Sequence, residues 1–284
     1  MRTPVRRTHG GGDGGTPSGA KSSDFVQSLD RGLAVIRAFD AEHPRLTLSE
    51  VSRTTGLTRA AARRFLLTLV ELGYVRSDGR DFSLRPRVLE LGYAYLSGMS
   101  LTEVAQPHME ELVGRVHESS SIAVLDGHDV VYIVRVPTKR IMAVAIAVGT
   151  RFPAYVSAMG RVLLAGRPGP ELDRYMTEVD LRPLTDRTVV DRDRLRAVIE
   201  EVGRQGFAVV DQELEDGIRA VAVPIRDGTG ASVAAINIAV HASRVSLETL
   251  REVFLPLLLA TAEDIERDVR AQGPRGPSVA RTLR

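Results

Sequence analysis

Apolar side chains near the start of the chain recur with the spacing of a helix. Between residues 28 and 40, Leu29, Leu33, Ile36 and Phe39 fall on one face. This stripe predicts a helix whose apolar face packs under the elements that follow it.

Two more helices are predicted next, joined by a glycine. Thr47 and Glu50 match a capping box, in which each side chain bonds a free backbone N–H at a helix start. Gly56 then supplies a sharp turn, and Thr58 can cap a longer helix. The apolar positions with helical spacing along that helix are Ala62, Phe65, Leu66 and Leu69. This order of elements is that of a helix-turn-helix, although an ordinary helical hairpin with a solvated arginine face fits the same pattern.

A β-hairpin is predicted directly after the longer helix. Gly73 fits the left-handed residue that ends a helix. Extended stretches at residues 74–76 and 82–84 flank a Ser-Asp-Gly-Arg turn at residues 77–80. Helices followed by such a hairpin form a winged helix-turn-helix, which we expect at residues 25–85.

Candidate DNA-binding residues lie on the longer helix, at its cap and along the hairpin. The N-terminal residues of a recognition helix meet base edges, and an arginine can bond guanine O6 and N7 together. Hairpin arginines would meet phosphates instead. The candidates are Thr47, Thr58, Arg59, Ala60, Arg63, Arg64, Arg76 and Arg80. The expected partner is double-stranded operator DNA with a palindromic sequence, because winged helices read such sites as two-fold dimers.

The rest of the chain predicts a linker and an α+β domain. The apolar positions of residues 86–100 exceed what one winged helix can cover, so we expect a linker helix that pairs with a second subunit. Further helices are predicted at residues 101–118, 158–165, 191–205 and 247–269. Strands are predicted at residues 121–126, 130–136, 140–148, 207–211, 219–226 and 232–240. Grouped strands and Asp-Gly turns at residues 126–129 and 227–230 favour an antiparallel sheet covered by helices.

Composition limits the possible classes of protein. The 284 residues, 43% of them hydrophobic, are enough for two domains. No apolar run of about 18 residues occurs, and no signal region follows the N-terminal arginines, so we expect a cytoplasmic protein without a membrane partner. The absence of cysteine excludes disulfides, thiolate metal sites and cysteine nucleophiles. Residues 1–24 and 271–284 are rich in Gly, Pro, Ser and Arg, and disorder is expected there.

Charge is distributed unevenly along the chain. Residues 25–97 carry 11 basic and 8 acidic side chains, whereas residues 98–270 carry 20 basic and 26 acidic ones. A basic module joined to an acidic one is typical of a DNA-binding domain with a second function, because phosphate contacts supply most nonspecific affinity.

A second candidate site lies where a helix is predicted to begin at Ala158. The free N–H groups and positive dipole end of a helix start can bind a carboxylate, here at Ala158, Met159 and Gly160. Plain capping by Ser157, with Gly160 present for close packing, explains the same residues. Three arginines could either add charge to an anion site or pair with structural carboxylates: Arg135, Arg151 and Arg161.

Polar residues in the later strands are further candidates. Asp211 and Glu213 alternate along a strand end, and Asn237 lies between isoleucines, where its amide needs a hydrogen-bond partner. The six histidines show no ligand spacing, so we expect neither a metal nor a cofactor. An enzyme is the competing class, but no G-x-S-x-G elbow surrounds Ser157 and no histidine has an identifiable partner.

Several long motifs, in order, resemble the IclR family of bacterial transcription factors. They are PAYVSAMGRVLLA, GFAVVDQELEDGIRAVAVPI and AAINIAVHASRVS. Three others resemble the subfamily of protocatechuate and β-ketoadipate pathway regulators: DFVQSLDRGLAVIRAF, LTRAAARRFLLTLVELGYV and RVHESSSIAVLDGHDVVYIVRV. The resemblance covers about residues 24–269.

This resemblance implies a GAF-like effector domain, which we place at residues 101–270. Such a domain binds a small anionic aromatic acid or dicarboxylate, and family membership implies a homodimer or tetramer that activates or represses transcription. The positions that correspond to effector contacts are Met142, Ala158, Met159, Gly160, Asp211, Glu213, Ala220, Asn237 and Ala239. Other members carry a cysteine near Ala220 and serines near Asn237 and Ala239, and these departures leave the ligand open.

Overall fold

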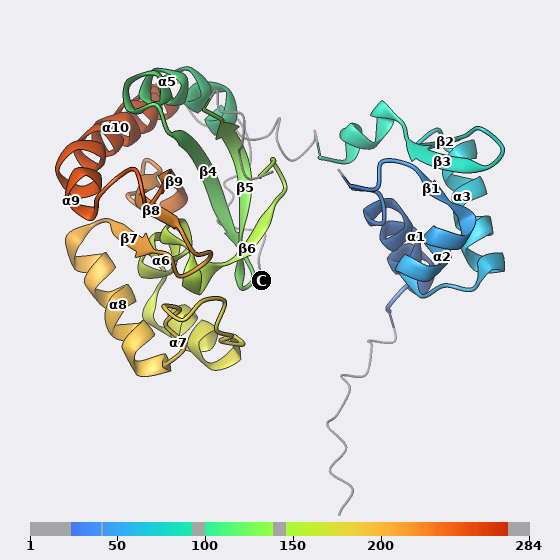
Figure 1. The fold of residues 1–284 in the computed structure, drawn as a ribbon, viewed down its shortest axis with the longest axis horizontal. Coiled ribbons are helices and arrows are strands. Elements are labelled where there is room, and N and C mark those ends of the chain that lie inside the picture. Colours follow the sequence, from blue (N-terminus) through green and yellow to red (C-terminus); the bar gives the residue numbers. More distant parts are fainter. Residues whose placement is uncertain (1–23, 41, 93–99, 139–145, 272–284) are drawn as a thin grey trace, which may run out of the picture. The chain divides into compact units, whose positions relative to one another are not determined.

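The chain folds into two compact units. The computed structural model describes residues 24–40, 42–92, 100–138 and 146–271. The first unit covers Met1–Gly92 and the second covers Tyr93–Arg284 (Figure 1). Among the described residues, no helix has the length and apolar character needed to cross a bilayer.

The first unit is a winged helix-turn-helix, as predicted. Its helices are α1 (Gln27–Arg37), α2 (Leu48–Thr55) and α3 (Arg59–Glu71). Its strands are β1 (Leu46–Thr47), β2 (Val75–Ser77) and β3 (Asp81–Leu84), and they form an antiparallel sheet in the order β1-β3-β2. Strand β1, which pairs with β3, the second strand of the hairpin, was not predicted because two residues carry no alternation pattern.

Local signals explain where these helices start and stop. The Thr47 Oγ1 accepts from the Glu50 N–H at 3.3 Å, and the Glu50 carboxylate accepts from the Thr47 N–H at 2.7 Å, which completes the capping box. Gly56 and Gly73 adopt left-handed φ values of +67° and +80° at the ends of α2 and α3. The Tyr74 N–H bonds the Leu69 carbonyl at 2.9 Å, so the end of α3 is a Schellman motif.

The predicted packing face of α1 was partly wrong. Phe39 is buried, but Leu29 and Leu33 are 63% and 44% exposed, whereas Val35 is fully buried. Apolar residues occupy more than one face of this helix, and the positions of α2 and α3 decide which face enters the core. The spacing along the sequence does not carry that information.

The linker predicted at residues 86–100 lies partly within the described residues. It begins as the 3-10 helix η1 (Pro86–Leu89), and helical backbone continues through residues 90–92. Residues 93–99, like the two predicted tails at 1–23 and 272–284, lie outside the described part of the chain.

The second unit is an antiparallel sheet with helices on both faces. Its strands are β4 (Ser119–Asp126), β5 (Asp129–Val136), β6 (Arg151–Pro153), β7 (Ala208–Asp211), β8 (Ile218–Arg226) and β9 (Ser232–His241). The strand order is β6-β5-β4-β9-β8-β7, and every neighbouring pair is antiparallel. The α+β fold class is therefore confirmed.

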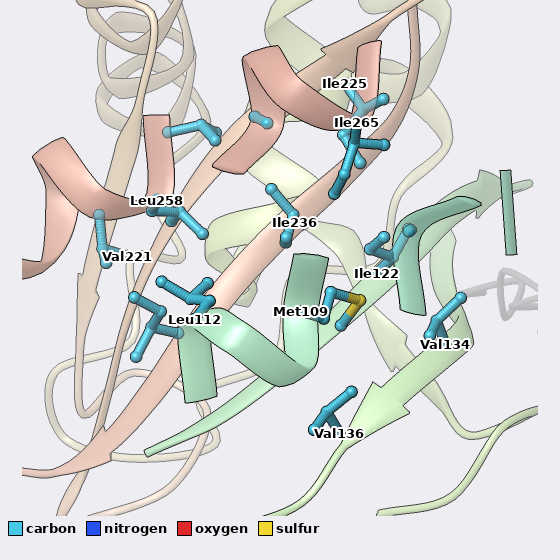
Figure 2. Packing of buried hydrophobic residues seen from close by; sticks show 14 of the residues in the cluster. Met109, Leu112, Ile122, Val134, Val136, Val221, Ile225, Ile236, Leu258 and Ile265 are labelled. Carbon is cyan, nitrogen blue, oxygen red and sulfur yellow. The ribbon is translucent and has the colours of Figure 1, made fainter. Parts of the chain in front are cut away.

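One face of this sheet is covered by two long helices. They are α5 (Ser100–Val116) and α10 (Leu255–Ala271). Figure 2 shows Met109 and Leu112 of α5, with Leu258 and Ile265 of α10, pointing at buried residues of the strands. This cluster is a continuous apolar core between the helices and the sheet.

The opposite face, which we call the α6 face, carries shorter helices. These are α6 (Ala158–Ala165), α7 (Gly169–Glu178) and α8 (Arg192–Gln205), with the 3-10 helix η2 (Ala154–Val156) preceding α6. A second apolar cluster joins α6, α7 and α8 to residues of β5, β7, β8 and β9. Helix α6 lies against β8 and β9, whose small residues Ala222 and Ala235 allow the approach.

Three predictions for this unit need correction. Residues 146–148 of the strand predicted at 140–148 are not extended, residues 139–145 lie outside the described part, and β6 pairs with β5 instead. Helix α7 was not predicted. The final helix is divided into α9 (Leu247–Thr249), the π-helix η3 (Leu250–Phe254) and α10. Pro256, which lacks an N–H and cannot bond the carbonyl four residues before it, lies two residues after this π-helix.

Candidate functional site

The N-terminal half of α3 presents a cationic surface. The Thr58 Oγ1 caps the helix by accepting from the Ala61 N–H at 3.2 Å. Arg59, Ala60 and Arg63 are exposed, and so is Arg64. Within the described residues none of these arginines has an ion-pair partner, so their guanidinium groups are available to nucleic acid. Thr47 differs, because its hydroxyl bonds the Glu50 carboxylate at 2.8 Å in the α2 cap.

The hairpin turn is organised by Asp78. Its carboxylate accepts from the N–H groups of Arg80 and Asp81, at 3.2 and 2.8 Å, and from Arg45 Nη2 at 2.5 Å. The backbone bonds from Asp81 and Arg80 are the main reasons that the pKa of Asp78 is lowered. Arg76 donates from Nε to the Ser83 hydroxyl at 2.8 Å. Arg80 contributes its backbone N–H to this turn, and its side chain is exposed at the tip of the wing.

The start of α6 is capped and buried. The Ser157 Oγ accepts from the Gly160 N–H at 3.4 Å, and Ala158 and Met159 are almost fully buried. A Cβ on residue 160 would lie 2.2 Å from the Ala154 carbonyl oxygen, so only glycine fits there. Of the two interpretations of this motif, the observed contacts match capping and close packing.

Glu213, a candidate effector-binding residue, forms an ion pair with Arg161. The Arg161 Nη1 and Nη2 atoms lie 2.7 and 2.6 Å from the two carboxylate oxygens. Arg161 Nε also donates to the Tyr155 carbonyl at 2.8 Å, and the Val189 N–H donates to Glu213 at 3.1 Å. Both side chains are buried, so this pair links α6 to the segment after β7.

Asp211 is also engaged by arginines. Its carboxylate lies 2.6 Å from Arg219 Nε and 3.2 Å from Arg187 Nη1. Burial raises the pKa of Asp211, but the hydrogen bonds from Arg219 and Gln212 outweigh this effect and leave that pKa below its ordinary value. Both carboxylate oxygens of the half-buried Asp211 therefore have hydrogen-bond donors within the protein.

Three other candidates lie together on the α6 face. Ala220 pairs with Ala239 across β8 and β9, and Asn237 pairs with Ala222 one row away. Directly opposed residues of antiparallel strands point to the same side of the sheet. Ala222 packs in the apolar cluster with α6, so these side chains also lie on the α6 face. Ala220 and Ala239 are partly exposed although both lie in inner strands. Each of the two alanines presents only a methyl group to this face.

The same rows contain polar residues that the sequence reasoning missed. Ser119 is opposite Ala239, and Ser121 is opposite both Asn237 and Arg135. The Ser121 N–H donates to Asn237 Oδ1 at 3.1 Å. This bond fixes the amide orientation and leaves the Asn237 Nδ2 as a donor. The available signal was a run of three serines, Ser119–Ser121, at the start of an otherwise apolar strand.

Arg135 completes this group as a cation. Its Nη1 lies 3.3 Å from the Ser121 hydroxyl, and no carboxylate within the described residues pairs with it. Burial lowers the pKa of Arg135, and burial raises the pKa of the neighbouring Tyr132 to about 12. Arg151, by contrast, is bound to Asp126 and Asp129 at 2.6 and 3.1 Å. Of the three arginines considered from sequence, only Arg135 lacks a carboxylate partner in the described structure.

Two further expectations from the sequence concern Met142 and metal binding. Met142 lies outside the described residues. In the part of the chain that the structure describes, no group of three or more metal-ligating side chains comes together.

Two family models match this pair of units. The model described as the IclR helix-turn-helix domain matches residues 28–79, and that of the bacterial transcriptional regulator IclR C-terminal domain matches residues 93–267. The chain belongs to the IclR family of bacterial transcriptional regulators. As an IclR regulator it is a DNA-binding transcription factor and not an enzyme.

Individual relatives place the chain within the IclR family. The Pca regulon regulatory protein of Pseudomonas putida is 46% identical over 243 residues, which cover 85% of this chain and 84% of that protein. A crystal structure from Rhodococcus sp. RHA1, described as a transcriptional regulator, is 58% identical, has a TM-score of 0.79 and covers 88% of this chain and 100% of its own. An IclR homologue from Microbacterium hydrocarbonoxydans, crystallised with 4-hydroxybenzoate, is 26% identical with a TM-score of 0.77 and coverage of 86% and 99%.

Proposed function

We propose that a small aromatic carboxylic acid binds on the α6 face and controls the binding of this regulator to operator DNA. The observation that carries the proposal is Arg135, a half-buried cation without a carboxylate partner in the described structure. A guanidinium and a carboxylate form two parallel charge-assisted hydrogen bonds, which supply both affinity and orientation. Arg135 is therefore the proposed anchor for the acid.

The other side chains of this surface suit the rest of such a molecule. Asn237 Nδ2 and the Ser121 hydroxyl offer hydrogen bonds beside Arg135. Ala220 and Ala239 offer apolar space for a ring. Small-molecule sites combine apolar walls with a few placed polar groups in this way. The 4-hydroxybenzoate complex of the Microbacterium relative and the Pca regulon name of the Pseudomonas relative support an aromatic acid of the protocatechuate and β-ketoadipate pathway.

Operator recognition in this proposal is divided between α3 and the wing. Arg59 and Arg63, with Thr58 and Ala60, meet base edges, and Arg76 and Arg80 meet phosphates. The acid acts by binding one DNA-binding state more tightly than the other, and it can shift the equilibrium only by that difference in affinity. Because bacterial operator DNA lies in the cytoplasm, the protein acts there.

A homodimer is the proposed assembly. Phe25, Val26, Leu29 and Leu33 form an exposed apolar stripe at the start of α1, with exposed fractions of 42–63%. Leu89 and Leu91 of the linker are also exposed, at 71% and 54%. Contiguous apolar surface of this kind marks an interaction site. Sedimentation of wild type and of Leu29→Glu tests this: a shift from dimer to monomer supports it, a tetramer that dissociates to dimers extends it, and an unchanged assembly contradicts it.

The effector proposal is tested by gel shift and calorimetry on the full chain. Probes are the promoter region beside the gene, with protocatechuate, 4-hydroxybenzoate or β-ketoadipate added. We expect an aromatic acid to change operator binding, and Arg135→Gln to weaken acid binding about tenfold or more, the cost of a lost charged hydrogen bond. Arg151→Gln is the matched control and should leave acid binding unchanged. A response to β-ketoadipate alone, or equal binding by wild type and Arg135→Gln, would refute the proposal.

A further inference from the structure

The side chain of Arg87 connects three parts of the winged helix-turn-helix. Its Nη1 donates to the carbonyl of Leu72, at the end of α3, at 2.8 Å. Its guanidinium carbon lies 5.4 Å from the centre of the Tyr74 ring, at the start of the wing. Its Nε lies 3.4 Å from the carboxylate of Glu90, in the segment that leaves the unit. One side chain therefore contacts the recognition helix, the wing and the linker.

The carbonyl that Arg87 binds is not satisfied by the Schellman turn. The backbone bonds of that turn go to Leu69 and Val70, at 2.9 and 3.0 Å. The last carbonyls of a helix need partners from outside it, and a cation there also opposes the negative end of the helix dipole. Arg87 supplies both effects at Leu72, so the orientation of the end of α3 depends on a residue of η1.

Gly73 supplies the left-handed backbone of this turn, directly beside the Arg87 side chain. It has a φ of +80°, and a Cβ there would meet Arg87 Nη1 at 3.4 Å and Arg87 Cδ at 3.6 Å. The Arg85 N–H also bonds the Tyr74 carbonyl at 2.8 Å, which holds the outgoing end of the hairpin against its start. These contacts fix the angle between α3 and the wing.

We propose that Arg87 is a positioning residue for operator recognition. By fixing α3 against the wing, it allows arginines of α3 to reach base edges while arginines of the wing lie on phosphates. Base contacts need accurate alignment, whereas sequence-independent phosphate contacts tolerate small rotations. Loss of Arg87 should therefore reduce discrimination between operator and other DNA, with little effect on nonspecific affinity.

The test compares full-length variants on two fluorescent duplexes, the operator and a scrambled sequence of equal length, over a range of salt concentrations. Arg87→Ala should raise the Kd for the operator about tenfold, within the cost of one lost base contact, and leave the Kd for the scrambled duplex and the salt slope unchanged. Arg87→Lys should recover part of the discrimination, because an ammonium can still donate to Leu72. Arg85→Ala, which removes an adjacent exposed cation and keeps the backbone bond to Tyr74, should leave the ratio of the two Kd values unchanged.

Other results would overturn the proposal. If Arg87→Ala weakens both duplexes equally and lowers the salt slope by about 1, Arg87 is a phosphate contact. If neither Kd changes, Arg87 has no role in recognition. Circular dichroism checks that the variant is folded. If the alanine variant unfolds, Arg87→Gln, which keeps a donor without the charge, enters the same comparison and is judged by the same outcomes.

Discussion

Arg161 and Glu213 form a two-bond ion pair inside the second unit, with N···O distances of 2.7 and 2.6 Å and side chains only 3% and 10% exposed. Each partner also bonds the backbone, at Tyr155 and Val189. A charge in the interior is tolerated only when it is paired in this way. The pair therefore fixes α6 in place, and breaking it should destabilise the domain that carries the α6 face.

Replacing Glu213 with glutamine should be strongly destabilising. It leaves the Arg161 charge buried without a counterion, and we expect the free energy of unfolding to fall by about 3 kcal/mol. Urea unfolding measures this. Glu171→Gln, which breaks the exposed pair with Arg167, should cost less than about 1 kcal/mol. If both variants lose the same free energy of unfolding, the buried pair stabilises the protein no more than an exposed one.

Gly160→Ala should destabilise the protein by about 1–3 kcal/mol or more. Its Cβ would lie 2.2 Å from the Ala154 carbonyl oxygen, and a backbone atom cannot move aside cheaply. Gly114→Ala is the control, because a Cβ at that exposed position inside α5 meets nothing within 4 Å. Melting curves should show a lower Tm for the first variant and an equal or higher Tm for the second. An unchanged Tm for Gly160→Ala would contradict the packing described for α6.

Arg63→Ala and Arg80→Ala should weaken operator binding in different ways. Arg63 lies on the exposed face of α3, so its loss should relax base preference at one position and cost about 1–3 kcal/mol. Arg80 lies at the tip of the wing, so its loss should weaken binding evenly across sequences. Titration of single-base operator variants separates the two effects. The same loss of discrimination from both changes would remove this division of roles.

Asp211→Asn should destabilise the protein in a pH-dependent way. The folded pKa of Asp211 lies below its ordinary value of 3.8, so the charged form is favoured in the folded state. The resulting stabilisation is fully present above about pH 5 and is lost as the pH falls through the lowered folded pKa. The difference in unfolding free energy between wild type and Asp211→Asn should therefore be constant near neutrality and shrink below pH 4. A difference that is the same at pH 3 and pH 7 would refute this role.

Local signals in the sequence were enough to locate most helices of both units. The capping box at Thr47, the left-handed glycines and the Asp-Gly turns each act within a few residues, so their geometry can be deduced from neighbours alone. The apolar runs of β8 and β9 were also recognisable as strands. Helix α7 was missed because its apolar positions, Leu172, Tyr175 and Met176, cover only one turn between charged residues.

Relationships between distant parts of the chain could not be deduced in this way. Arg161 and Glu213 are 52 residues apart in the sequence. Nothing in the sequence around either residue indicates that it pairs with the other and not with a ligand. The exposure of Leu29 depends on where α2 and α3 lie. Arg135 and Ser121 become neighbours only through the register of β4 and β5, which shifts by a bulge at Ile122 and Ala123. Sites formed across strands thus require the fold itself.

Ala220 and Ala239 give this regulator a simple route to new specificities. Each presents only a methyl group, so replacing it with a larger side chain removes no hydrogen bond and breaks no ion pair. The arginines that we propose to contact operator DNA belong to the other unit and are not altered by such changes. If the proposed effector site is correct, a library confined to these two positions would change which acid is sensed while the promoter remains the same, which is the property that a biosensor scaffold needs.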